Sequence, residues 1–301
     1  MKKYKKNVII TGALGQDGRI LSKIFTKNKF QVIGIVKNIK KKITGVKYYK
    51  IPLNNFSLLS KTLSKLDPDI FIHLGADNPN FLETKKYLFK KNYLIAKNIL
   101  DFFSAYKKKT KIILIGSSQM YNKNNLKIDL NTNFKPQNAY AKFRVKSYKY
   151  MLKIKKKNLI KASMTILFNH DSIYRNKKFL MPRMVKLIKT KNFLSLRKIF
   201  NENISGDFSH ADDICNGIYK LSNSKYNPDK LILSSNKRTF INDIINYLLN
   251  FTNNKIKFNK SKNKKYVNSI GNNGFAKKIL KWDVKKNSFI AAKELFQNLY
   301  K

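Results

Sequence analysis

The stretch VIITGALGQDGRIL, residues 8–21, decides the fold. Its first four residues form a short apolar run typical of a buried strand, and its last three begin a helical pattern. Between the two stand three glycines at three-residue intervals, Gly12, Gly15 and Gly18. Glycine lets the backbone turn tightly and approach a pyrophosphate, which then faces the start of the helix. Strand, glycine loop and helix in this order predict a dinucleotide-binding site.

Short apolar runs continue to alternate with amphipathic, helix-length segments through about two-thirds of the chain. Stacked βα units around a parallel sheet have this pattern, so we predict an α/β fold with a Rossmann-type doubly wound parallel sheet. The predicted strands are residues 8–11, 31–36, 70–74, 111–116 and 162–168. The predicted helices are residues 17–27, 57–66, 84–106 and 139–155.

The alternation weakens after residue 168, where the elements become shorter. These predicted elements are residues 179–189, 211–221, 241–251 and 288–299, with a lysine-rich loop at 253–265. The change divides the chain into an NAD(P)-binding domain, residues 1–168, and a smaller α/β substrate-binding part, residues 169–301, interleaved with the first.

The charge is strongly positive, because 64 Lys and Arg residues stand against 16 Asp and Glu residues, for a formal net charge of +48. Such a charge attracts polyanions, which makes nucleic-acid binding a rival interpretation. The lysines are nevertheless scattered along the whole chain, and no nucleic-acid-binding motif accompanies them. Lysine, asparagine and isoleucine are all abundant, as the composition of an AT-rich genome would produce. We therefore expect no specific nucleic-acid partner.

Composition also limits the other classes of protein. A chain of 301 residues that is 43% hydrophobic can bury a large core. The only cysteine, Cys215, cannot form an internal disulfide, and the three histidines show no metal-ligand spacing with it. No apolar run of about 18 residues occurs. We expect a cytoplasmic protein without a metal site or a membrane span.

The end of the second predicted strand bears on the cofactor. A site specific for NAD needs a carboxylate there for the ribose 2′-hydroxyl, whereas NADP needs cations for a 2′-phosphate. Residues 34–40 contain no acid, and Lys37 follows the strand directly. NADP is therefore the predicted cofactor, with NAD as the alternative.

The fourth predicted strand delivers hydroxyl groups to the carboxyl edge of the sheet, where Ser117 follows its last residue. Some twenty residues later, Tyr140 and Arg144 lie four residues apart on one face of a predicted helix. A phenol has a pKa near ~10, and it must give up its proton to oxidise an alcohol; a nearby cation favours the phenolate. We predict that Ser117, Tyr140 and Arg144 form a reaction centre for hydride transfer.

Together these elements resemble the extended short-chain dehydrogenase/reductase family, which includes the NAD-dependent epimerases and dehydratases. Ser117 and Tyr140 match the catalytic serine or threonine and the tyrosine of that family, and Arg144 stands where the family has a lysine. Within it, several stretches are similar to the GDP-mannose 4,6-dehydratase family: residues 15–18 (GQDG), 166–172 (ILFNHDS), 207–213 (DFSHADD) and 271–282. The likeness extends over nearly the whole chain.

The resemblance implies a nucleotide-sugar enzyme that transiently oxidises C4 of its substrate with bound NADP, and a GDP-linked substrate. It also implies a homo-oligomer. For the cofactor it indicates Gly12, Gly15, Gln16, Asp17, Gly18, Lys37, Leu53, Asn54, Leu74 and Ala76. For the phosphates of the substrate it indicates Asn169 and Arg183.

One catalytic position departs from the family pattern. A 4,6-dehydratase removes the C5 proton with a glutamate two residues after the catalytic hydroxyl, and here Gln119 occupies that position. An amide cannot carry this proton, which would cost about 10² to 10⁴ in rate. Asp77 or a bound water is the alternative proton carrier.

Because of this departure, three functions remain open. The first is a GDP-mannose 4,6-dehydratase-like enzyme, by overall resemblance. The second is a nucleotide-sugar 4-ketoreductase or epimerase, which needs only the hydride chemistry of Ser117 and Tyr140. The third is a catalytically silent protein that binds NADP or a polyanion.

Overall fold

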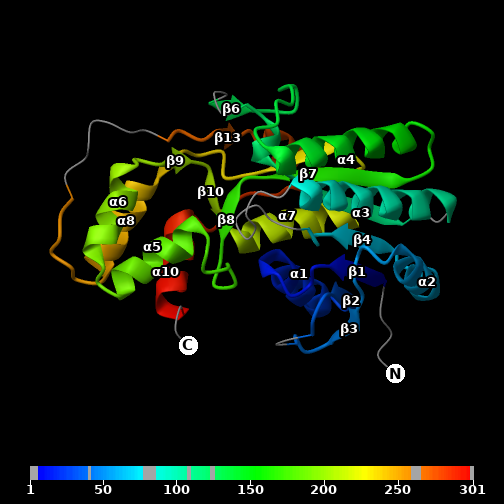
Figure 1. Ribbon diagram of the computed structural model, residues 1–301, viewed down its shortest axis with the longest axis horizontal. Helices are drawn as coiled ribbons and strands as arrows, with labels where there is room; N and C mark the ends of the chain where they lie inside the picture. Colours follow the sequence, from blue (N-terminus) through cyan, green and yellow to red (C-terminus); the bar gives the residue numbers. More distant parts are fainter. Residues whose placement is uncertain are drawn as a thin grey trace.

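A seven-stranded parallel sheet forms the centre of the molecule (Figure 1). It is seen in a computed structural model that describes residues 6–39, 42–76, 86–106, 110–122, 126–258 and 266–298. The strand order is β11-β7-β5-β4-β1-β2-β3. The strands are β1 (Asn7–Thr11), β2 (Gln31–Val36), β3 (Val46–Lys50), β4 (Ile70–His73), β5 (Lys111–Ser117), β7 (Lys161–Leu167) and β11 (Lys230–Leu233).

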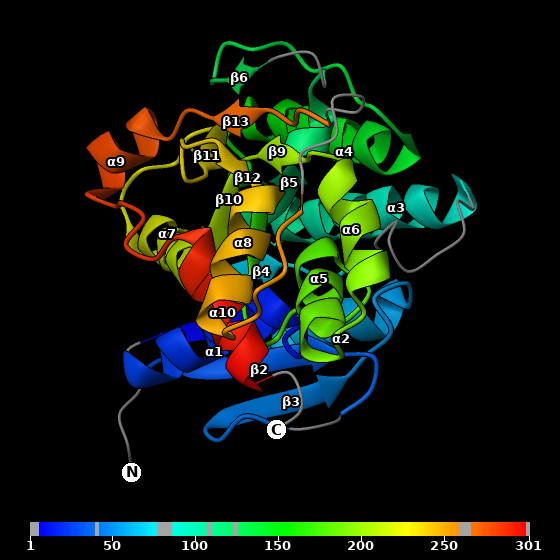
Figure 2. The same cartoon turned by 90° about the vertical axis from the view of Figure 1, so that its left-hand side faces the viewer.

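Helices cover both faces of this sheet, which explains why the central strands are apolar along their whole length. One face is covered by α2 (Phe56–Leu66), α3 (Lys86–Ala105) and α4 (Ala139–Lys155). The other is covered by α1 (Gln16–Lys27), α7 (Ala211–Asn223) and α9 (Gly274–Leu280). Figure 2 shows α3 and α4 on one side of the sheet and α7 with α9 on the other. Each face has its own hydrophobic core.

A third core lies beside the sheet, in the lobe on the left of Figure 1. It is built by α5 (Leu180–Lys189), α6 (Phe193–Asn201), α8 (Ile241–Phe251) and α10 (Ser288–Asn298). Three small two-stranded sheets lie outside the central sheet. They pair β8 (Asn169–Asp171) with β10 (Phe208–His210), β9 (Ser205–Gly206) with β12 (Thr239–Phe240), and β6 (Lys127–Ile128) with β13 (Ile270–Gly271).

The predicted fold class is confirmed, and two strands are added to the predicted sheet. Both are edge strands: β3 lies at one edge, and β11 closes the other by pairing with β7. Because β11 and α7 follow residue 168, the later part of the chain contributes to the sheet of the earlier part.

Two predicted segments fall partly outside the described residues. The helix predicted from residue 84 is described from Lys86 onward. Of the predicted loop at 253–265, residues 253–258 have no regular secondary structure, and the rest is not described. No helix within the described ranges is long and apolar enough to cross a membrane.

Candidate active site

The glycine loop between β1 and α1 has the backbone geometry of an anion-binding turn. Gly12 has a φ of +69°, in the left-handed region that favours glycine. A Cβ atom on Gly18 would lie 2.4 Å from the carbonyl oxygen of Gly12, so only glycine allows α1 to approach the loop this closely. Gly15 precedes the first turn of α1, and no side chain caps that turn. The loop therefore presents the start of α1 to a phosphate group.

A pocket lies beside this loop at the carboxyl ends of β1, β2 and β4, and we call it the dinucleotide pocket. It is lined by Gly12, Ile35, Val36, Lys37, Ile51, Leu53, Asn54, Gly75, Ala76, Lys91, Asn92 and Ile95. Five of the predicted cofactor residues are among them: Gly12, Lys37, Leu53, Asn54 and Ala76. Apolar walls, two lysines and a glycine loop fit an adenine base and its phosphates.

Lys91 is a lining residue that the sequence did not indicate, since it lies inside a helix among many other lysines. None of the described residues that line the dinucleotide pocket is acidic.

A second pocket adjoins the first at Ala76, which lines both, and we call it the reaction pocket. It is lined by Asp17, Leu74, Ala76, Ile115, Gly116, Ser117, Ser118, Gln119, Tyr140, Arg144, Leu167, Phe168, Asn169, His170, Arg175 and Phe179. Ser117, Gln119, Tyr140 and Arg144 were predicted as catalytic, and the structure brings all four together here. Leu74, predicted for the cofactor, also lines this pocket.

The start of α4 orients the tyrosine and the arginine. Asn138 precedes the helix, and its Oδ1 accepts a hydrogen bond of 2.9 Å from the backbone N–H of Ala141. Tyr140 follows in the first turn. The guanidinium carbon of Arg144 lies 5.1 Å from the centre of the Tyr140 ring, and Arg144 is buried. A buried cation thus lies against the Tyr140 ring.

Gln119 lies in one turn of 3₁₀ helix after β5, next to Ser117. The backbone N–H of Gln119 donates to Ser117 Oγ at 3.2 Å. Asn138 Nδ2 donates to Gln119 Oε1 at 2.8 Å, so one asparagine both caps α4 and orients the Gln119 amide. Position 119, where the family has its glutamate, therefore lies at the pocket, and the Asn138 amide donates a hydrogen bond to the side chain there.

His73 ends β4 behind the reaction pocket and is neutral. Burial, and next the repulsion from the Arg144 cation, lower the pKa of His73 to about 3. Its Nδ1 lies 2.9 Å from Thr11 Oγ1, which itself accepts a hydrogen bond from the N–H of Gly75. The Thr11 hydroxyl can therefore donate its proton to the unprotonated Nδ1.

Gln16 and Asp17 extend their side chains from the first turn of α1 to β8. Asp17 accepts hydrogen bonds of 3.1 and 3.2 Å from Nε2 of His170, and Gln16 Nε2 donates to the His170 carbonyl at 3.2 Å. Both residues were predicted to bind the cofactor. Because their side chains are committed to β8, their contribution to a cofactor would come from the backbone.

The Asp17–His170 contact is a buried ion pair. Burial alone would raise the pKa of Asp17, but the His170 charge and the hydrogen bonds from His170 and Gln16 lower it to about 2. Burial alone would lower the pKa of His170, but the Asp17 charge and hydrogen bond raise it. Both groups are therefore held in their charged forms.

The segment after β8 supplies a cation that the sequence did not indicate. Arg175 lines the reaction pocket, its guanidinium carbon lies 3.7 Å from the centre of the Phe179 ring, and its Nε lies 3.2 Å from buried Asp171. Asn169, predicted for the substrate phosphate, lines the same pocket. Arg183, predicted for the same role, is exposed on α5 and is not among the lining residues. The spacing Asp171-x₃-Arg175 was the only signal available for Arg175.

Two of the other family-like stretches hold the fold together. Asp207 is buried and accepts backbone N–H groups from Ser235, Asn236 and Gly271. Trp282 Nε1 donates to the backbone carbonyl of Asp213 at 2.8 Å. Within the described ranges, no three His, Cys, Asp or Glu side chains gather as metal ligands.

Comparison with known proteins finds relatives along almost the whole chain. The family described as "GDP-mannose 4,6 dehydratase" matches residues 9–287. GDP-mannose 4,6 dehydratase 2 of Caenorhabditis elegans is 22% identical over 266 residues, which is 80% of this chain and 69% of that protein. GDP-mannose 4,6 dehydratase of Dictyostelium discoideum is 23% identical over 269 residues, 81% of this chain and 75% of that protein.

Solved structures share the fold at lower identity. UDP-glucose 4-epimerase of Thermotoga maritima superposes with a TM-score of 0.82 at 16% identity, over 97% of this chain and 98% of that one. The dTDP-glucose 4,6-dehydratase of Bacillus anthracis, solved with NAD, superposes with a TM-score of 0.81 at 14% identity, over 98% of this chain and 96% of that one. These likenesses show the Rossmann-type fold.

Proposed function

Because this chain belongs to the GDP-mannose 4,6-dehydratase family, we propose that it oxidises the C4 hydroxyl of a GDP-linked hexose, using NADP as the cofactor. One observation carries the proposal: Ser117, Tyr140 and Arg144 line one pocket, which adjoins the dinucleotide pocket at Ala76. A sugar placed in the reaction pocket would lie next to a dinucleotide placed in the dinucleotide pocket. The family consists of nucleotide-sugar enzymes, so this chain is an enzyme of that kind.

Each reacting group has a defined task. Tyr140, as the phenolate, takes the proton of the C4 hydroxyl, and Ser117 holds the same oxygen by a hydrogen bond. Arg144 is a buried cation whose guanidinium carbon lies 5.1 Å from the centre of the Tyr140 ring. A bound nicotinamide supplies the hydride acceptor.

The choice of NADP rests on the charges of the dinucleotide pocket. Lys37 and Lys91 line it, and the described lining contains no carboxylate for a ribose 2′-hydroxyl. Gly12 and Gly18 would let the pyrophosphate approach the start of α1. Solved structures of similar fold that were determined in complex with NAD support a nicotinamide cofactor in general.

Cations around the reaction pocket support an anionic, nucleotide-linked substrate. Arg144, His170 and Arg175 line the pocket together with Asn169. Asp17 pairs with His170, and Asp171, outside the lining, pairs with Arg175, which leaves the charge of Arg144 in excess. We assign the substrate diphosphate to Arg175 and Asn169, because Arg183 lies outside the lining. By resemblance to its family, the enzyme is proposed to be a homo-oligomer.

For the complete reaction, 4,6-dehydration is the first candidate. The second candidate is 4-keto reduction or C4 epimerisation, which the amide of Gln119 favours. Asp17 is the only acid among the described residues that line the reaction pocket, and it is paired with His170. Asp77 lies outside the described residues. Without a carboxyl group to remove the C5 proton, the same pocket suits a 4-ketoreductase or a C4 epimerase, which need only hydride transfer.

The test is incubation of the purified protein with NADP and a panel of GDP-, UDP- and dTDP-linked hexoses, followed by mass spectrometry of the products. Loss of one water from GDP-mannose supports the dehydratase. A product of unchanged mass but altered C4 stereochemistry supports the epimerase, and a loss of two hydrogens with formation of NADPH supports a ketoreductase working in the oxidative direction. No product from any sugar, with intact NADP binding, would point to a catalytically silent protein.

Gln119→Glu separates the first two candidates. Asn138 Nδ2 already donates to position 119, so a carboxylate would be accommodated there. If the chain is a dehydratase that lacks its proton carrier, elimination should rise by about 10² to 10⁴. If it is a reductase or epimerase, the water-loss product stays absent. Gln137→Glu nearby is the matched control, since its amide bonds the Lys135 carbonyl and lies outside the reaction pocket lining.

A further inference from the structure

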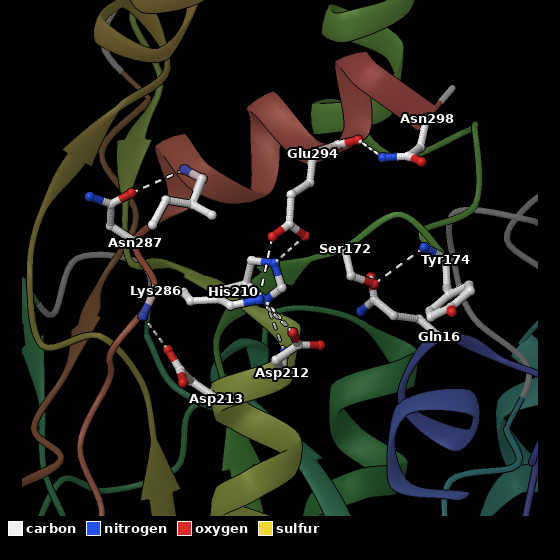
Figure 3. A network of polar contacts seen from close by, with 11 residues as sticks. Gln16, Ser172, Tyr174, His210, Asp212, Asp213, Lys286, Asn287, Glu294 and Asn298 are labelled. Atoms are coloured by element: carbon white, nitrogen blue, oxygen red, sulfur yellow. Dashed lines mark hydrogen bonds and ion pairs between the residues drawn. The ribbon is translucent and has the colours of Figure 1, made fainter. Parts of the chain in front are cut away.

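A set of side chains connects the first turn of α1, which follows the glycine loop, to β8 beside the reaction pocket, and we call it the crevice bridge. It consists of Gln16 and Asp17, from the first turn of α1, and His170 and Ser172, from β8 and the residue after it. Asp17 accepts from His170 Nε2 at 3.1 Å, Gln16 Nε2 donates to the His170 carbonyl at 3.2 Å, and Ser172 Oγ donates to Gln16 Oε1 at 3.2 Å. Figure 3 shows Gln16 beside Ser172.

His170 is a cation in this bridge on geometric grounds. Its Nδ1 lies 2.7 Å from the carbonyl oxygen of Phe168, and its Nε2 faces the Asp17 carboxylate. Both ring nitrogens therefore have acceptors as partners, which only the doubly protonated ring can satisfy. The neighbouring charges are Asp17, Asp171 and Arg175, and His210 lies on the adjacent strand β10.

The crevice bridge lies next to the proposed sites of both ligands, the cofactor phosphates and the nucleotide sugar. Gln16 and Asp17 contribute the first backbone N–H groups of α1, which face the phosphate site. His170 follows Asn169 directly, and Asn169 lines the reaction pocket. An unpaired Asp17 carboxylate would repel a pyrophosphate at the helix start, and the His170 cation neutralises it.

We propose that the crevice bridge couples the two sites, so that NADP bound at the glycine loop tightens the binding of the nucleotide sugar. The proposal rests on the function proposed above. Phosphates that order the first turn of α1 also order Gln16 and Asp17, and these hold β8 and Asn169 in place. Linkage requires the effect to be reciprocal: the substrate nucleotide must tighten NADP by the same factor.

The experiment measures dissociation constants by isothermal titration calorimetry, with NADP and GDP as the probes. GDP is titrated into the full chain with and without saturating NADP, and NADP with and without saturating GDP. In the unmodified protein we expect each ligand to tighten the other by about five-fold or more. Equal factors in the two directions are a required internal check.

Asp17→Asn removes the ion pair to His170. In this variant each ligand should therefore change the affinity of the other by less than about two-fold, and we call this change the coupling factor. The coupling factor is the readout because it compares each affinity with and without the second ligand, so a change in the affinity for NADP alone does not alter it. Ser172→Ala is a milder second variant, which removes only one hydrogen bond of the bridge and should lower the factor partly. If the bridge had a purely structural role, these variants would weaken the binding of both ligands and leave the coupling factor unchanged.

Glu294→Gln is the matched control. Glu294 on α10 accepts a hydrogen bond of 2.9 Å from Nε2 of buried His210, as Figure 3 shows, and neither residue lines the dinucleotide pocket or the reaction pocket. This variant should keep the full coupling factor. Independent binding in the unmodified protein, or full coupling in Asp17→Asn, would overturn the crevice bridge alone. Failure of either NADP or GDP to bind would overturn the proposed function as well.

Discussion

At the scale of single residues, the proposed chemistry depends on the Tyr140 hydroxyl. Tyr140→Phe removes the proton acceptor but keeps the ring beside Arg144, so the fold and the ligand pockets should be unchanged. We predict that hydride transfer falls by about 10² to 10⁴, followed as formation of reduced nicotinamide. Tyr150→Phe, on the same helix but bonded to Asp101 outside the reaction pocket, is the control. Equal activity in the two variants would refute the assignment.

His73 gives a second prediction at this scale, through its pKa. The pKa is about 3 in the folded protein and 6.5 in the unfolded chain, so the unfolded state binds a proton first as the pH falls. Stability from neutral His73 is therefore present above pH 6.5 and is lost as the pH falls toward 3. Between about pH 8 and about pH 5 the loss should be about 2 kcal/mol.

The measurement is urea unfolding across this pH range, with His73→Asn as the comparison. Asparagine can still accept the Thr11 hydroxyl proton but does not titrate. The variant should lose that part of the pH dependence, whatever its absolute stability. The same slope in both proteins would show that His73 titrates normally in the folded state.

At the scale of elements, the junction of the glycine loop with α1 is the most constrained part of the site. In Gly18→Ala the new methyl group would meet the backbone of Gly12 and Ala13 at 2.4 to 2.7 Å, so the helix must move away from the loop. We predict a loss of about 1–3 kcal/mol in unfolding free energy, together with weaker NADP binding. Differential scanning calorimetry and titration with NADP measure the two effects.

Gly274 provides the control for this substitution. It also lies in the first turn of a helix, α9, but a Cβ there meets only the side-chain oxygen of Asn272, at 3.1 Å. Gly274→Ala should be nearly neutral and should bind NADP normally. If the two alanine variants behave alike, close packing of α1 on the loop is not what makes glycine necessary at position 18.

At the scale of the whole molecule, the net charge of +48 opposes compaction. Because 64 Lys and Arg residues stand against 16 Asp and Glu residues, most of the cationic side chains have no carboxylate to balance them, and like charges repel. We predict that the melting temperature rises as sodium chloride increases from about 0.01 to about 0.5 M, because the Debye length shortens from about 30 Å to a few ångströms. A melting temperature that falls with salt would contradict this.

Local patterns were sufficient for the main elements of the fold. Residues 8–21 predicted β1, the glycine loop and α1, because a strand and a helix differ in period and glycine marks the turn between them. The edge strands β3 and β11 were not predicted. β3 has the sequence VKYYK, which is half-exposed and rich in lysine, and β11 is only four residues long. Edge strands lack the continuous apolar run that identifies a strand buried between neighbours.

The sequence by itself determined that a glycine loop, a strand-end serine and a Tyr140–Arg144 pair exist, since each depends on residues within a few positions of one another. Only the tertiary structure decided which side chains meet at the crevice. It placed Arg175 in the reaction pocket and Arg183 outside it, and it paired Asp17 with His170 across 153 residues of chain. Such contacts depend on how helices and strands pack against one another, and lysines spread evenly along the chain gave no signal for Lys91.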